Sequence, residues 1–227
     1  MSDQRALRAL TREDVFVLAS LLATLTGIIL GAIFAAPQAF GVTALVVLTL
    51  LLAAQRLTRS PVLAWLLLAG LVAGVLELWA DWIHVEYTHA LVYTDFFGFR
   101  LLASPSYMPI GWLVTVTQFG YIALRLRQLW PGWLVVVAMC ALGLVQPPWY
   151  EELAAPARAW RYQSTGPMLS HTPLWILGTY AGCLFFIATA SLALYAKRDW
   201  PRALLAGVYI GAGLLLSSVV WYSILGR

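Results

Sequence analysis

Charged residues are scarce in this chain: Asp, Glu, Lys and Arg make up 11% of its 227 residues, against about 25% in an ordinary soluble domain. Hydrophobic residues make up 62% of the chain, and the mean hydropathy is +0.82. So few charges cannot cover a water-exposed surface, and disorder requires the opposite composition. The composition therefore excludes a water-soluble globular protein and a disordered chain, and it predicts a single integral membrane domain over residues 1–227.

Cysteine and lysine are also rare. Cys140 and Cys183 both lie in apolar stretches, so the sequence predicts no disulfide framework. Lys197 is the only lysine and lies in a polar connection, so no lysine is placed within the membrane to form a Schiff base with retinal. The net charge of +4 does not indicate a nucleic-acid partner, because the basic residues are spread over the connections between apolar runs.

The apolar runs predict an all-α membrane bundle of about seven transmembrane helices. A bilayer core about 30 Å thick requires about 20 predominantly apolar residues in helical form. By that measure the spans are roughly residues 15–36, 40–55, 61–83, 108–127, 131–147, 172–196 and 203–224.

The basic residues predict the orientation of the bundle. Most of the 14 lie on one side, at Arg5, Arg8, Arg12, Arg56, Arg59, Arg125, Arg127, Lys197, Arg198 and Arg202. The other side holds Arg100, Arg158, Arg161 and Arg227. The positive-inside rule then places the N-terminus inside and the C-terminus outside. We expect the host to be a bacterial inner membrane.

A polar stripe late in the third predicted span is the most informative feature. Glu77, Asp81, His84 and Thr88 fall within an arc of about 60° on one helix face. Glu77 lies about 24 Å along the helix from Pro61, still inside the hydrocarbon. An ionisable residue at that depth costs on the order of 2.5–3.5 kcal/mol.

Two interpretations of this stripe are open. Adjacent carboxyl groups that share a proton can serve general acid catalysis, with Glu77 or Asp81 as the donor and His84 tuning it. Alternatively, the acids are solvated at a helix end, or Glu77 pairs with Arg100. We expect Glu86, Glu151 and Glu152 to be solvated loop charges. Gln118 lies in the middle of a span and needs a hydrogen-bond partner there.

The segment that follows carries a family resemblance. The run Tyr93-Thr-Asp95-Phe-Phe-Gly98-Phe-Arg100, continuing to Pro109-Ile-Gly-Trp112 and with Glu77 upstream, resembles the signature of the integral-membrane carotenoid biosynthesis proteins. That family includes hydratases that add water to the terminal double bond of an acyclic carotenoid. The chain departs from the family pattern at residues 81–87, where members tend to carry a Gly-rich, Pro-Phe-Gly segment.

The resemblance implies an enzyme that protonates an alkene of an isoprenoid or another lipid-soluble substrate. Glu77 or Asp81 would be the acid, and Asp95 or His84 would deliver the water that captures the cation. Capture by an internal group of the substrate would instead make the enzyme a cyclase. No cofactor is needed for either outcome. The residues expected to bind substrate are Trp79, Tyr93, Trp112 and Gln118.

The sequence is also compatible with two other functional classes. Asp81, His84 and His89 could bind zinc, iron or copper in a metal-dependent enzyme that acts on lipids. The chain could also be a transporter or a subunit of a membrane complex. The expected partners are membrane lipids and a lipid-soluble small molecule, with no nucleic acid, and the oligomeric state is left open.

Overall fold

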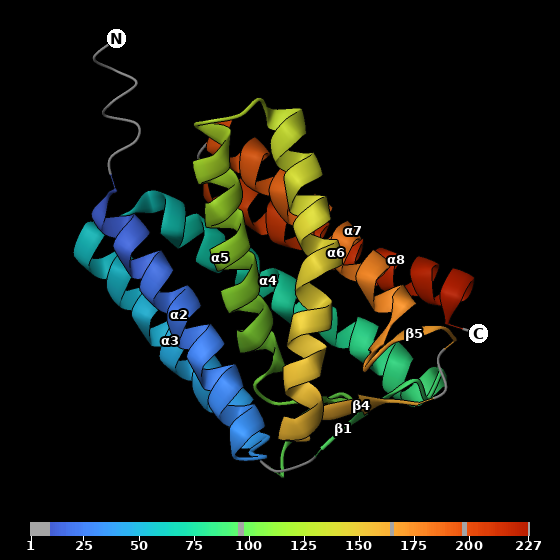
Figure 1. Ribbon diagram of the computed structural model, residues 1–227. Coiled ribbons are helices and arrows are strands. Elements are labelled where there is room, and N and C mark those ends of the chain that lie inside the picture. The colour runs from blue at the N-terminus through green and yellow to red at the C-terminus, as the bar shows by residue number, and fades with distance from the viewer. Residues whose placement is uncertain (1–9, 95–97, 164–165, 197–198, 227) are drawn as a thin grey trace.

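The computed structural model describes residues 10–94, 98–163, 166–196 and 199–226, and these form a helical bundle (Figure 1). Asp95, one of the expected catalytic residues, lies outside the described residues. The helices are α2 (Arg12–Ile33), α3 (Gln38–Thr58), α4 (Pro61–Trp82), the π-helix η1 (Ile83–Tyr87), α5 (Met108–Arg127), α6 (Gly132–Ala157), α7 (Leu174–Ala196) and α8 (Trp200–Leu225).

The all-α class is confirmed, and the chain is an integral membrane protein. Within the described ranges, 6 helices are long and apolar enough to cross a membrane: α2, α3, α4 with η1, α6, α7 and α8. The seventh long helix, α5, has 20 residues and does not reach the same apolarity. Its interior carries Thr115, Thr117 and Gln118, and it packs deep in the bundle.

Local sequence explains where several helices begin. Thr11 and Asp14 form a reciprocal capping box at α2, and the Ser60 hydroxyl accepts a hydrogen bond from the Leu63 amide at α4. Asp199 caps α8 in the same way by accepting from the Arg202 amide. Each cap satisfies a backbone N–H that the first helical turn leaves free.

Helix α6 is longer than the sequence predicts. The predicted span ends at residue 147, whereas the helix continues through Pro147, Pro148 and Pro156 to Ala157. Proline is tolerated in membrane helices where neighbouring groups satisfy the freed backbone. The prediction that Glu151 and Glu152 belong to a loop is therefore wrong: both lie on the last turns of α6.

Helix α4 lies at the centre of the bundle and packs closely on α5. A Cβ atom added to Gly70 would lie 2.6 Å from the Leu113 carbonyl oxygen, and one added to Gly74 would collide with the Pro109 carbonyl. Small residues four apart allow two helix backbones to approach each other in a membrane. This contact places the end of α4 beside the start of α5.

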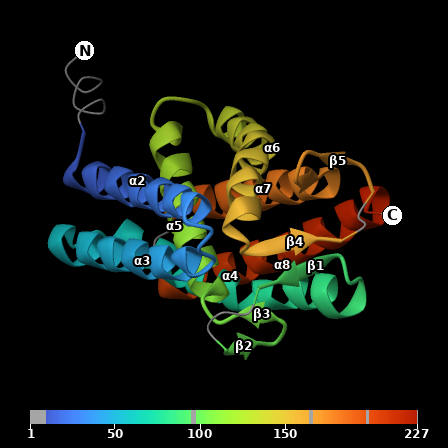
Figure 2. The ribbon, with the colours of Figure 1, turned by 60° about the horizontal axis from the view of Figure 1, so that its bottom comes forward.

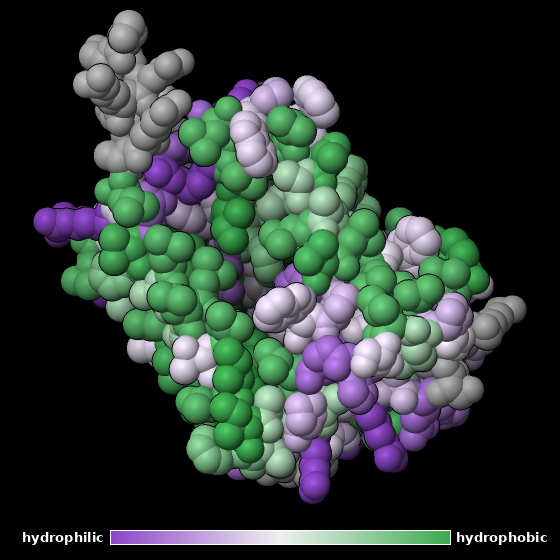
Figure 3. Space-filling model, viewed as in Figure 1, coloured by the Kyte–Doolittle hydropathy of each residue, from purple (hydrophilic) through white to green (hydrophobic). Residues whose placement is uncertain are grey.

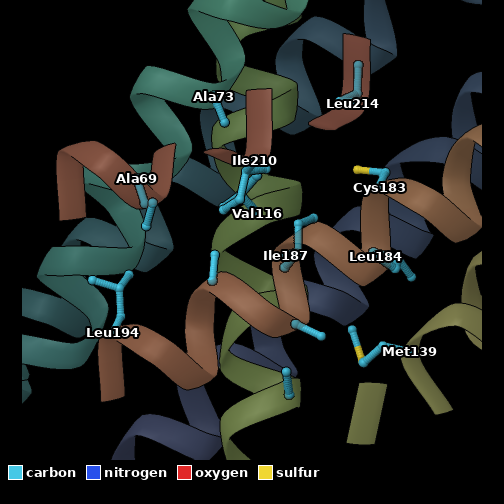
Figure 4. Close-up of a cluster of buried hydrophobic side chains, with 14 of the residues drawn as sticks. Ala69, Ala73, Val116, Met139, Cys183, Leu184, Ile187, Leu194, Ile210 and Leu214 are labelled. Carbon is cyan, nitrogen blue, oxygen red and sulfur yellow. The ribbon is translucent and has the colours of Figure 1, made fainter. Parts of the chain in front are cut away.

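A second face of α4 contributes to the main hydrophobic core (Figure 4). Ala69 and Ala73 of α4 meet Val116 of α5, Ile187 of α7 and Ile210 of α8, all nearly inaccessible to solvent. Dense apolar packing of this kind holds the helices in one arrangement. The polar residues of α4 lie beyond this core, toward one end of the bundle.

Short antiparallel strand pairs close that end, and the sequence analysis did not anticipate them. The pairs are β1 (Leu91–Tyr93) with β4 (Trp160–Tyr162), β2 (Arg100–Leu101) with β3 (Ser104–Pro105), and β5 (Met168–Leu169) with β6 (Thr172–Pro173). The β1–β4 pair joins the two long connections, with Val92 opposite Arg161 (Figure 2). The space-filling view shows hydrophobic side chains over the flanks of the bundle and hydrophilic ones gathered at this end (Figure 3).

Candidate active site

A cavity of about 330 Å³ lies between the helices, just inside the end closed by β1 and β4. Each of the seven long helices contributes to its wall, from Leu21 on α2 to Ser218 on α8. Small-molecule sites in proteins have volumes of about 300–1,000 Å³, so the cavity is large enough for part of a lipid-sized ligand.

The predicted polar stripe faces this cavity. Glu77, Asp81 and His84 all line it and are 3%, 6% and 3% exposed. The three residues share one face because α4 continues past its apolar part into η1. In the described structure neither carboxyl group forms a salt bridge with an arginine. Both acids are buried, so the interpretation that they are solvated at a helix end is wrong.

Asp81 is the anchored member of the carboxyl pair. Its Oδ2 accepts hydrogen bonds from the Tyr93 hydroxyl and from the Ser104 hydroxyl, each at 2.7 Å. These donors come from β1 and β3, so the strand pairs hold Asp81 in place. Glu77 lies against Asp81 and the Trp112 indole. Its Oε2 atom is buried and has no hydrogen-bond partner among the described residues.

His84 sits between aromatic rings. Its ring centroid lies 4.6 Å from that of Trp175 and 5.2 Å from that of Tyr222. Both ring nitrogens are buried, and neither has a hydrogen-bond partner in the part of the chain that the structure describes. An imidazole held in this way is positioned by packing alone, so its nitrogens are available to a ligand in the cavity.

A third buried carboxyl group faces the cavity from α6. Glu151 is 3% exposed and lines the cavity wall. It accepts hydrogen bonds from Trp160 Nε1 at 2.7 Å and from the Tyr162 hydroxyl at 3.0 Å. Both donors belong to β4, so Glu151 anchors that strand as Asp81 anchors β1.

Aromatic rings form much of the remaining wall. Trp112 and Tyr180 lie with ring centroids 5.9 Å apart, and Tyr150 stacks on Trp160 at 5.4 Å. Faces of such rings stabilise a cation held within about 6 Å. The cavity therefore combines buried acids with surfaces suited to a positive charge.

The tyrosines of the strand segment are neutral donors. Burial raises the pKa of the Tyr93 phenol well above its usual value, and the nearby charges of Asp81 and Glu77 raise it further. Burial also raises the pKa of Tyr162, next to Glu151. Both phenols keep their protons at neutral pH and can donate to the carboxyl groups.

The other predicted residues divide into two groups. Tyr93, Trp112 and Gln118 line the cavity, although the Gln118 amide also donates to Ser20 at 3.0 Å and to Thr24 at 3.1 Å and so ties α5 to α2. Trp79 does not reach the cavity: it is 52% exposed and packs edge-on against Trp82 on the outer surface.

The residues expected to bind a metal are not brought together. His89 is exposed, and its ring bonds to the Val85 carbonyl oxygen at 3.1 Å. Asp81 and His84 line the cavity, whereas His89 does not. Among the described residues, no group of three or more His, Cys, Asp and Glu side chains converges in a way that could hold a metal ion.

Sequence reasoning missed Glu151, Gln146 and Trp175 as cavity residues. A signal for Glu151 was present in the sequence. The buried positions of α6 recur every four residues, at Val135, Met139, Gly143, Pro147 and Glu151. Extending that spacing past the two prolines would have placed Glu151 on the inner face.

The chain was also compared with known proteins. No curated protein and no solved structure matches it. One family does: residues 78–225 match the family described as a domain of unknown function, DUF6989. The matched region begins directly after Glu77 and contains Asp81, His84 and Glu151. Because it covers more than half of the sequence, the chain belongs to the DUF6989 family.

Proposed function

We propose that this protein is a membrane enzyme that protonates an alkene of an isoprenoid or another lipid-soluble substrate, as a hydratase or cyclase does. The observation that carries the proposal is the Glu77–Asp81 pair, which is buried at an aromatic cavity. The Glu77 Oε2 atom has no hydrogen-bond partner within the described ranges. The resemblance to carotenoid hydratases is part of the same proposal.

The hydrogen bonds around the two acids support different proposed roles for them. Asp81 Oδ2 already accepts two hydrogen bonds, from Tyr93 and Ser104, and such bonds stabilise a carboxylate. Two neighbouring carboxyl groups in a low-dielectric site share one proton rather than both ionising. Glu77 then carries the proton that is transferred, and Asp81 is the neighbouring carboxylate that shares the proton returned at the end of the cycle.

The reaction begins when the Glu77 proton is transferred to one alkene carbon. The π electrons form the new C–H bond, and the other carbon becomes a tertiary cation. Rings such as Trp112 and Tyr180 stabilise that cation through their faces.

The cation is resolved by an electron pair from water or from the substrate itself. Capture by water forms a C–O bond, and the released proton returns to the Glu77–Asp81 pair. Attack by an internal double bond forms a ring, and loss of a proton to the same pair ends the cycle. Asp95 is proposed to orient the water, which leaves His84, whose ring nitrogens have no hydrogen-bond partner among the described residues, to bind a polar group of the substrate.

We also propose seven spans, with α5 as the seventh. Helix α5 contains 20 residues, enough to cross the bilayer core, and the other helices shield its polar positions. Arg56, Arg125 and Arg127 lie at the end of the bundle opposite the strand pairs. This end would face the cytoplasm, with the strand end outside a bacterial inner membrane.

The test uses purified protein in lipid nanodiscs with a panel of acyclic isoprenoid alkenes, and products are identified by mass spectrometry. General acid catalysis contributes about 10²–10⁴ in rate, so E77Q should lose at least about 10² of the activity. E86Q is the matched control, because Glu86 lies nearby but is exposed. Equal activity in E77Q and the wild type, or no product from any alkene, would contradict the proposal.

A further inference from the structure

Among the residues that the structure describes, four side chains in the cavity wall carry buried polar atoms with no hydrogen-bond partner. They are Glu77 Oε2, both ring nitrogens of His84, Gln146 Oε1 and Trp175 Nε1, and all four residues line the same cavity. Buried polar groups in folded proteins are nearly always paired. Several unpaired groups around one cavity therefore indicate a ligand with polar atoms of its own.

The unpaired atoms specify the kind of group they would bind. The Trp175 indole can only donate a hydrogen bond, and the Gln146 Oε1 atom can only accept one. A neutral imidazole, as in His84, offers one donor and one acceptor. A hydroxyl group both donates and accepts, and it matches this set better than a ketone or an ether, which only accept.

The charge of the wall excludes an anionic ligand group. Two carboxyl centres, Glu77–Asp81 and Glu151, face the cavity, and no lysine or arginine is present among its described lining residues. A phosphate or carboxylate would meet like charge there without a cation to pair with. The polar group of the ligand is therefore neutral.

We propose that the substrate of this site is an isoprenoid alcohol, with its hydroxyl group bound by His84, Trp175 and Gln146. The inference rests on the proposed function and narrows its substrate class from lipid-soluble alkenes to hydroxylated isoprenoids. His84 follows Glu77 by seven residues, or about 10 Å of helical rise. The hydroxyl end and the alkene that Glu77 protonates thus lie in different parts of an extended chain.

Binding distinguishes this inference from the proposed chemistry. Calorimetry in detergent would compare farnesol with its 1-deoxy hydrocarbon and with farnesyl phosphate. Each neutral hydrogen bond changes affinity by about two- to tenfold, so farnesol should bind at least about tenfold more tightly than the hydrocarbon. Equal affinity for the alcohol and the hydrocarbon, or tighter binding of the phosphate, would overturn the inference.

Variants locate the hydroxyl group. W175F and Q146L should each reduce the preference for farnesol over the 1-deoxy hydrocarbon at least about twofold. W79F, on the outer surface, should retain that preference. Because Trp175 is 1% exposed, W175F could fail to fold, and the half-buried Gln146 provides the independent variant. A preference that survives Q146L and a folded W175F would overturn the assignment of these residues.

Turnover is measured separately on the same samples. E77Q should bind farnesol with the wild-type preference even though it loses catalysis. Turnover of the hydrocarbon together with equal binding of both probes would support the proposed chemistry and overturn the hydroxyl assignment. If the wild type prefers farnesol but turns over no alkene, the hydroxyl assignment would be supported and the proposed chemistry would be overturned.

Discussion

Asp81 accepts hydrogen bonds from the hydroxyl groups of Tyr93 and Ser104, so its removal should disturb the strand pairs as well as the carboxyl pair. Both donors lie on the strand pairs, and both point at the same carboxylate oxygen. Asp81 is therefore as much a structural anchor for these strands as a partner for Glu77. This dual role separates the effects expected from substitutions at the two acids.

Asp81→Ala should destabilise the protein more than E77Q does. The alanine leaves the buried Tyr93 and Ser104 hydroxyls unpaired, at a cost of about 1–3 kcal/mol in the free energy of unfolding. Thermal unfolding in detergent, followed by circular dichroism, measures the difference. Unchanged stability in Asp81→Ala would show that the two hydrogen bonds do not hold the strands.

Stability should also fall at alkaline pH. Burial raises the pKa of Tyr93, Tyr107 and Tyr162 in the folded protein, whereas an unfolded tyrosine ionises near pH 10. The folded state then holds protons that the unfolded state releases, so stability is complete below about pH 10 and is lost as the pH rises further.

The measurement is the unfolding midpoint at pH 8 and at about pH 11, together with the ultraviolet absorbance of phenolate. Y93F should weaken the loss, because it removes one of the protons retained on folding. A midpoint that does not change over this range, or phenolate absorbance from these buried tyrosines near pH 10, would contradict the assignment.

Much of the residue-level site could be predicted from the sequence, because helical periodicity places Glu77, Asp81 and His84 on one face. Trp79 shows where that reasoning stops: interfacial tryptophans face lipid as readily as a cavity, and sequence does not distinguish the two. The unpaired nitrogens of His84 depend on Trp175 and Tyr222, which come from other helices. Contacts of that kind follow only from packing.

At the level of elements, the close approach of α4 and α5 brings Glu77 next to Trp112. Gly70 and Gly74 permit it, since a side chain at either position would meet the backbone of α5. The Leu113 carbonyl oxygen leaves no room for a methyl group at Gly70, and a backbone atom cannot rotate away. The distance between these helices therefore controls the geometry of the carboxyl pair.

Gly70→Ala should separate the two helices and lower stability by about 1–3 kcal/mol, as overpacking of a dense core does. Gly111→Ala is the matched control on α5, because nothing lies within 4 Å of its added Cβ. Unfolding in detergent would be compared for both variants. Equal stability of Gly70→Ala and the wild type would argue against the tight α4–α5 contact.

Most helix boundaries followed from apolar length, and α5 was predicted at residues 108–127, as observed. The exceptions have physical causes. The prolines of α6 suggest an end to the helix in water, yet in this bundle the helix continues to Ala157. The strands contain two or three residues each, too short to show an alternating pattern, and they form because distant loops meet.

For the whole molecule, the positive charges predict which end faces the cytoplasm. The turn between α5 and α6 lies at one end of the bundle and the β1–β4 pair at the other (Figure 1). Leu129 in that turn is 60% exposed, and Phe99 at the strand end is 61% exposed. Both positions therefore suit labelling from solution.

In a C140S/C183S background, Phe99→Cys should react with a membrane-impermeant maleimide in intact cells. Leu129→Cys should react only after the cells are permeabilised, because the positive-inside rule places it in the cytoplasm. The labelled protein is quantified by gel shift. The reverse pattern would show that the proposed topology is inverted. Labelling of both positions in intact cells would show that α5 does not cross the membrane.

In the proposed mechanism, Glu77 gives a proton to a substrate carbon inside the cavity. Turnover in D₂O tests it directly, because the carboxyl group exchanges with solvent and the alkene does not. We expect one deuterium bonded to carbon in each product molecule formed by the wild type, and at least about 10²-fold less labelled product from E77Q. Product without a new carbon–deuterium bond, or undiminished labelling by E77Q, would contradict it.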